Sequence, residues 1–161
     1  MYTYKYPMQS VTADMVVFHN NEVLLIKRNN EPFKGKFAIP GGHMDETDNN
    51  VYEAAERELR EETGIKAHKA IKNGTVGVYS EKDRDPRGRY VTIAYYLVFA
   101  SKPKVNINDE EVKEYKWVDI DKIKEEEMAF DHYEILLDVK NAIIKDSRYV
   151  TYLWEKEMFG K

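Results

Sequence analysis

The sequence contains no cysteine, which excludes disulfide bonds, thiolate metal sites and a cysteine nucleophile. No apolar run approaches the roughly 18 residues that a membrane-spanning helix needs. The first ten residues also lack the apolar segment of a secretory signal. Positive charge is not in excess, because the net charge is −4, so the overall balance gives no sign of binding to nucleic acid or to membranes. We therefore expect a cytoplasmic protein without either partner.

The chain has the composition of an ordinary globular domain. Hydrophobic residues make up 42% of its 161 residues and charged residues make up 34%. At this length one core can bury about two thirds of the chain's surface. We expect residues 1–161 to form a single domain.

Runs of β-branched and apolar residues alternate with two helical patterns. One helix is predicted over residues 50–63, where Asn50 and Glu53 form a capping pair and Gly64 stands at the C-terminal cap. A second amphipathic helix is predicted over residues 131–146. The order of elements has no regular βαβ alternation, which predicts an α+β protein with helices packed on a mixed sheet. The predicted strands are 11–18, 22–27, 37–39 (stopped by Pro40-Gly41-Gly42), 76–79, 91–99 and 115–118.

The first helix carries the strongest chemical signal. Glu58, Glu61 and Glu62 are three and four positions apart, so they share one face of the helix. Such a face is often merely solvated. Three clustered carboxylates nevertheless repel one another unless a cation lies among them, and Mg²⁺ prefers carboxylate oxygens. Arg57 precedes Glu58 and is placed to orient its carboxylate.

The segment from residue 41 to residue 65 resembles the signature of the Nudix hydrolases. That signature has a glycine, a carboxylate six residues later, and then Arg-Glu-(aliphatic)-x-Glu-Glu-x-Gly-(aliphatic). The matching positions are Gly42, Asp48, Arg57, Glu58, Leu59, Glu61, Glu62, Gly64 and Ile65. The chain departs from the pattern in having Asp48 in place of glutamate and one extra residue between Asp48 and Arg57.

The resemblance implies a Nudix fold, in which a mixed β-sheet is sandwiched between α-helices. It also implies catalysis that depends on Mg²⁺, for which Mn²⁺ can substitute. Glu58 and Glu62 would bind the first metal, Glu61 would help to hold a second metal and take part in catalysis with Arg57, and the carbonyl of Gly41 would complete the site. The general base is expected from a loop outside the signature, and Glu110 or Glu111 is the candidate.

Four further segments resemble the ADP-ribose pyrophosphatase branch of the family, which is related to the ligand domain of Nudix-type repressors of NAD metabolism. These segments are 6–14, 31–42, 83–89 and 129–136. The resemblance implies hydrolysis of a nucleoside diphosphate joined to another group, with ADP-ribose, giving AMP and ribose 5-phosphate, as the favoured substrate. The candidate substrate-binding residues are Arg28, Gly42, His43, Arg84, Arg87, Arg89 and His132. Each also has a local structural interpretation, such as a solvated strand end, a soluble loop or a helix cap.

Two other functions stay open on the sequence. One is a house-cleaning pyrophosphatase that acts on nucleoside triphosphates, and the other is a module that senses ADP-ribose without cleaving it. The complete set of glutamates argues against the sensing module. The chain stops at Lys161 and leaves no room for the repressors' winged-helix module, so a transcription factor is disfavoured. Tyr2, Tyr4 and Tyr6 favour N-terminal packing or a homodimer contact over stacking on adenine.

Overall fold

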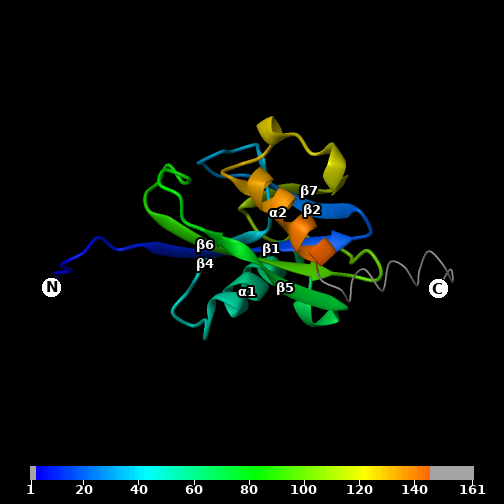
Figure 1. Ribbon diagram of the computed structural model, residues 1–161, viewed down its shortest axis with the longest axis horizontal. Helices are drawn as coiled ribbons and strands as arrows, with labels where there is room; N and C mark the ends of the chain where they lie inside the picture. The colour runs from blue at the N-terminus through cyan, green and yellow to red at the C-terminus, as the bar shows by residue number, and fades with distance from the viewer. Residues whose placement is uncertain (1–2, 146–161) are drawn as a thin grey trace.

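A mixed β-sheet forms the centre of the computed structural model, which describes residues 3–145. Its strands run in the order β3-β2-β1-β6-β5, with β4 paired to β1 and β7 paired to β2 (Figure 1). The β1–β6 pair is parallel, and the other pairs are antiparallel. The strands are β1 (Ser10–His19), β2 (Glu22–Arg28), β3 (Phe37–Ala38), β4 (Gly41–His43), β5 (Lys72–Tyr79), β6 (Tyr90–Val98) and β7 (Val112–Asp119), and the α-helices are α1 (Val51–Thr63) and α2 (His132–Lys145).

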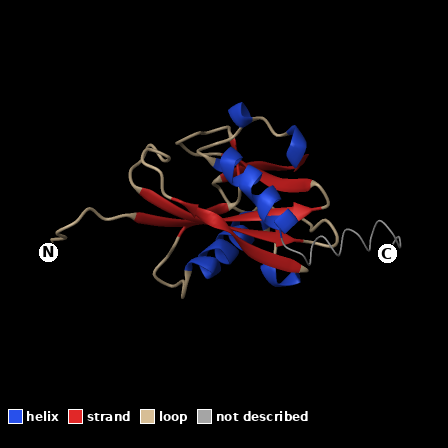
Figure 2. Ribbon diagram, in the orientation of Figure 1, coloured by secondary structure: helices blue, strands red, loops and turns tan. Residues whose placement is uncertain are grey.

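The two helices pack on opposite faces of this sheet, because the side chains of β1 alternate between two cores (Figure 2). Met15 and Val17 belong to the core that contains Leu59 of α1. Val16 and Phe18 belong to the core on the side of α2. The α+β architecture with a mixed sheet between helices is therefore confirmed. The last predicted position of the second helix, residue 146, lies outside the described residues.

The ends of α1 follow from its local sequence. The side chain of Asn50 accepts a hydrogen bond from the backbone N–H of Glu53 at 3.0 Å. The Glu53 carboxylate returns to Asn49 rather than to Asn50, accepting its backbone N–H at 3.1 Å. Gly64 ends the helix with φ 72°, a left-handed conformation that glycine adopts without strain. The predicted capping pair is confirmed, with its second half displaced by one residue.

β3 ends before Pro40, as predicted, but the two glycines that follow begin a strand that the sequence did not predict. Gly41–His43 forms β4, which pairs antiparallel with Thr12–Asp14 of β1. The sequence hides this strand because glycine is depleted in strands in general. Glycine is required here because neighbouring side chains come unusually close. A Cβ atom on Gly41 would lie 2.3 Å from Oδ1 of Asp14.

Two strands extend beyond their predicted limits. The strand predicted at 76–79 begins at Lys72, and the strand predicted at 115–118 begins at Val112. The added residues of β5 pair with the apolar end of β6, whereas those of β7 pair with Lys27 and Arg28. None of the helices in residues 3–145 is both long and apolar enough to cross a membrane.

We predict that Asn50→Ala lowers the free energy of unfolding by about 1 kcal/mol, because it removes the side chain that caps the helix carrying the glutamates. Urea denaturation would measure this change. Asn30→Ala is the matched control, since Asn30 is exposed and lies outside any helix. Equal stability of the two variants would contradict the assigned cap.

Candidate active site

A pocket opens where β4, the C-terminal half of α1, the loop at residues 80–89 and the start of α2 meet. It is lined by nine of the residues that the sequence predicted for the site: Arg28, Gly41, Gly42, His43, Glu62, Arg84, Arg87, Glu111 and His132. Arg57, Glu58 and Glu61 lie beside it on α1. Arg89 and Glu110 are exposed and do not line it. The structure therefore brings together residues from segments far apart in the sequence.

Glu58 and Glu62 of α1 lie against the two glycines of β4. The backbone N–H of Gly41 donates to Oε2 of Glu62 at 3.0 Å. A Cβ atom on Gly42 would lie 2.5 Å from Cδ of Glu58. Gly42 thus gives the Glu58 carboxylate space that any other residue would fill, whereas Gly41 gives such space to Asp14.

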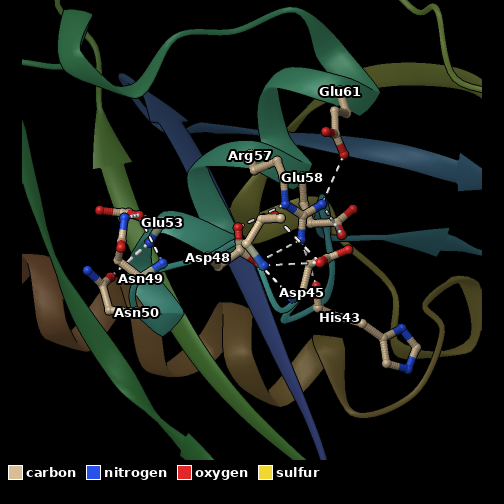
Figure 3. Close-up of polar contacts among 10 residues, drawn as sticks. His43, Asp45, Asp48, Asn49, Asn50, Glu53, Arg57, Glu58 and Glu61 are labelled. Carbon is tan, nitrogen blue, oxygen red and sulfur yellow. Dashed lines mark hydrogen bonds and ion pairs between the residues drawn. The ribbon is translucent and has the colours of Figure 1, made fainter.

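Arg57 connects the helix to the loop that precedes it (Figure 3). Its Nε and Nη2 donate to the two oxygens of Asp48, each at 3.0 Å. Its Nη1 donates to Glu58 at 2.8 Å and to Glu61 at 3.0 Å, and Nη2 also donates to the carbonyl of His43 at 2.8 Å. The predicted orientation of Glu58 by Arg57 is confirmed. Asp48 accepts both hydrogen bonds although its side chain is shorter than that of glutamate and one extra residue separates it from Arg57. The two departures from the signature therefore leave the contact between Asp48 and Arg57 intact.

Burial disfavours the charged forms of the three carboxyl groups beside β4. Burial raises the pKa of Glu62 well above its usual range, although the Gly41 N–H opposes this shift. Burial also raises the pKa of Glu58, against the lowering effect of Arg57. Asp14 of β1 is buried beside them, and burial raises its pKa to about 7. Oδ2 of Asp14 has no hydrogen-bond partner within the described residues.

This donor set suits a hard divalent cation in both chemistry and charge. A cation would relieve the mutual repulsion that Glu58 and Asp14 exert on Glu62. No group of three or more Asp, Glu or His side chains in residues 3–145 is already arranged around one point as a metal shell. Within the predicted set, the Glu61 side chain is 47% exposed and accepts a hydrogen bond from Arg57. Glu61 must break its hydrogen bond with Arg57 before it can take its predicted part in metal binding.

Arg84 has a role that the sequence did not predict. Its Nε and Nη2 donate to Asp131 at 2.7 and 2.5 Å, and its Nη1 donates to the hydroxyl of Thr92 at 2.6 Å. Every guanidinium nitrogen is therefore engaged, and only 5% of the side chain is exposed. Arg84 lines the pocket, but its contacts fix the loop at residues 80–89 to the start of α2.

His132 is likewise held by the protein. The backbone N–H of Ile39 donates to its Nδ1 at 2.9 Å, which requires a neutral ring with the proton on Nε2. That nitrogen lies 3.4 Å from Oδ2 of Asp14. Burial lowers the pKa of His132 to about 3, in agreement with the neutral form. The His132 side chain thus fixes the backbone at Ile39, just before Pro40.

Two other candidates, His43 and Glu111, line the pocket. His43 is exposed, with its ring 5.5 Å from that of Tyr90. Glu111 lines the pocket, whereas the adjacent Glu110 contributes its carbonyl to Asn29. Of the two candidate bases, only Glu111 lines the pocket.

Sequence reasoning missed Asp14 and Phe130, both of which line the pocket. A single carboxylate within the apolar run 11–18 was the available signal for Asp14. Nothing in the local sequence of Phe130 distinguishes it from a core aromatic residue.

We predict that Gly42→Ala weakens divalent-metal binding by on the order of tenfold, since the added methyl group would displace the Glu58 carboxylate. Calorimetric titration with Mn²⁺ would measure the effect. Gly77→Ala is the control, because its added Cβ would have its nearest contact at an ordinary 3.5 Å. Unchanged Mn²⁺ affinity in Gly42→Ala would refute this role for Glu58.

Comparison with known proteins agrees with this geometry. The chain is 40% identical over 131 residues to an ADP-ribose pyrophosphatase of Methanocaldococcus jannaschii, and the match covers 80% of this chain and 72% of that protein.

Two solved structures share the fold. One is the NUDIX domain of Shewanella oneidensis NrtR in complex with ADP ribose, with a TM-score of 0.77, 26% identity, and coverage of 86% of this chain and 90% of that one. The other is a bifunctional NMN adenylyltransferase/ADP ribose pyrophosphatase of Francisella tularensis in complex with AMP and a manganese ion. It has a TM-score of 0.74 and 30% identity, and the match covers 86% of this chain but 43% of that one. The NUDIX domain model matches residues 8–139, so this chain belongs to the NUDIX domain family.

Proposed function

We propose that the protein is a Mg²⁺-dependent hydrolase that cleaves the pyrophosphate bond of ADP-ribose and releases AMP and ribose 5-phosphate. The observation that carries this proposal is the division of one pocket into two charged sides. Carboxylates from α1 and β1 lie against β4, while Arg28 and Arg87 lie toward Phe130. A diphosphate bound to a divalent metal has the charges to fit between these sides.

The chain's own residues would divide the work as follows. Glu58 and Glu62 would hold the first metal, and Glu61 would approach a second after leaving Arg57. When bound, the metal would neutralise phosphate oxygens and acidify the attacking water. Arg57 would keep Glu58 in place, and Glu111 would accept the proton of the water.

The substrate assignment rests on similarity to the relatives of the pyrophosphatase type and on the shape of the charge distribution. The pocket contains acidic side chains beyond the metal-facing turn, namely Asp14, Asp85 and Glu111. The negative charge of these carboxylates would disfavour an additional phosphate, as in a nucleoside triphosphate. A nucleoside triphosphate, the substrate of the rival pyrophosphatase, would place its third phosphate against these carboxylates. A module that only senses the ligand would not need the complete set of glutamates.

The substrate test compares kcat/KM for ADP-ribose, NADH, diadenosine polyphosphates and deoxynucleoside triphosphates at one Mg²⁺ concentration. We predict the highest value for ADP-ribose. A tenfold lead for a triphosphate, equivalent to about 1.4 kcal/mol in transition-state binding, would overturn the assignment. Absence of hydrolysis with tight ADP-ribose binding would favour the sensing module.

We predict that Glu62→Gln lowers turnover by at least about a hundredfold, because it removes a metal ligand while preserving side-chain shape. The same variant should unfold at an equal or higher temperature than the wild type. The reason is that the fold already disfavours the charged form of this carboxylate. Steady-state kinetics and thermal unfolding would measure the two effects.

Glu56→Gln on the same helix is the matched control, since Glu56 lies outside the pocket. Near-normal turnover in Glu62→Gln would reject its role. A parallel loss of stability would instead make Glu62 a structural residue.

A further inference from the structure

Residues 3–9 form an arm that leaves the body of the molecule in line with β1 (Figure 1). All of them are exposed, and none of them belongs to a helix or a strand. Apolar side chains stand at every second position, namely Tyr4, Tyr6 and Met8, which are 59%, 72% and 67% exposed. This alternation is typical of an extended segment that buries one face, yet the apolar side of the arm is largely exposed. Tyr2, which the sequence groups with Tyr4 and Tyr6, lies outside the described residues.

The helix α1 covers only part of its face of the sheet. Leu97 of β6 is fully buried in the core that contains Leu59 of α1. Side chains at every second position share one face of a strand, so the α1 face of β6 also carries Val91, Ile93 and Tyr95. These three residues are only partly buried, whereas the residues between them, which face α2, are buried. One end of this face is therefore left open by α1.

The strand β5 extends this open surface to the edge of the sheet. Among the described strands, β5 pairs with β6 alone. Val78 lies opposite Ile93, so it shares the α1 face, and it is 63% exposed. Edge strands often carry charges that prevent pairing with other chains, but β5 has no charged residue from Asn73 to Tyr79. We name the surface formed by Val78, Val91, Ile93 and Tyr95 the β5–β6 patch.

The arm begins beside the β5–β6 patch but is directed away from it. The backbone N–H of Ser10 donates to the carbonyl of Arg89 at 3.0 Å, and Val11 pairs with Val91 of the patch. This pairing holds the start of β1 straight, so the arm runs past the end of its own sheet (Figure 1). The apolar side of the arm and the patch of the same chain therefore remain apart.

A second copy of the chain brings the arm and the β5–β6 patch together. In a two-fold symmetric pair the same contact occurs twice, so each arm meets the patch of the other copy. An arm of this length spans roughly 23 Å when it is extended. Neighbouring strands lie only about 4.8 Å apart, so the arm is long enough to cross both β6 and β5. Both surfaces are apolar, and their contact would remove both from water.

We propose that the protein is a homodimer in which the N-terminal arm of each copy lies on the β5–β6 patch of the other. Tyr6 and Met8 of one copy would pack on Val78 and Ile93 of the second copy. None of these four residues lines the pocket of the candidate active site, so the inference does not depend on the proposed function.

Sedimentation velocity over a range of protein concentrations tests the dimer. We expect a dimer for the wild type and for Tyr6→Phe, which retains the ring. Tyr6→Asp and Val78→Asp should each raise the dissociation constant at least about tenfold, because each would bury a carboxylate in an apolar contact. Tyr115→Asp is the matched control, since Tyr115 is 43% exposed and lies on β7, which pairs with β2 away from the patch.

The absence of cysteine allows a direct test of which surfaces touch. The variants Tyr6→Cys and Val78→Cys are made separately, mixed until their subunits exchange, and treated with a short bismaleimide cross-linker. We expect mass spectrometry to find a bridge between residues 6 and 78, which in this mixture can form only between two copies. A mixture of Tyr6→Cys with Tyr115→Cys is the control and should give no such bridge.

A wild type that stays monomeric up to millimolar concentration would refute the proposal. A dimer that Tyr6→Asp and Val78→Asp leave as tight as Tyr115→Asp does would also refute it, because another surface would then hold the copies together. An arm that folds back on its own patch would give a bridge in the Tyr6→Cys/Val78→Cys double variant but none in the mixture. If circular dichroism shows that Val78→Asp does not fold, Tyr6→Asp decides, since residue 6 lies outside every helix and strand.

Discussion

The contact between the carboxylates of α1 and the glycines of β4 is the constraint around which the pocket is arranged. Gly42 allows Glu58 to approach β4, since a Cβ atom there would lie 2.5 Å from Cδ of Glu58, and the backbone N–H of Gly41 holds Glu62. Burial in this position raises the pKa of both carboxyl groups. A divalent cation bound beside them would stabilise their charged forms.

Much of this arrangement could be predicted from the sequence because it depends on local patterns. The 3.6-residue periodicity placed three glutamates on one helix face, and the Asn50 and Gly64 caps fixed the helix limits. Alternation in β1 follows from the period of a strand, which accounts for helices on both faces. These signals lie within a few residues of one another, so a single sequence is sufficient to read them.

The rest depends on contacts between distant segments. Arg84 was expected to bind substrate, but Asp131 lies 47 positions later and occupies its guanidinium group. Arg87 and Arg89 are alike in sequence, and only the path of the loop directs Arg87 into the pocket. For the same reason Glu111 lines the pocket and the adjacent Glu110 does not. Side-chain direction in a loop is set by tertiary structure, which residue type does not encode.

We propose that the carboxylates beside β4 hold a divalent metal. Electron paramagnetic resonance measures this binding most directly, because the signal of free Mn²⁺ falls when the ion binds to the protein. We expect the metal-free wild type to remove Mn²⁺ from solution and to release it when Mg²⁺ is added. An unchanged signal of free Mn²⁺ at millimolar protein, both with and without ADP-ribose, would contradict the claim.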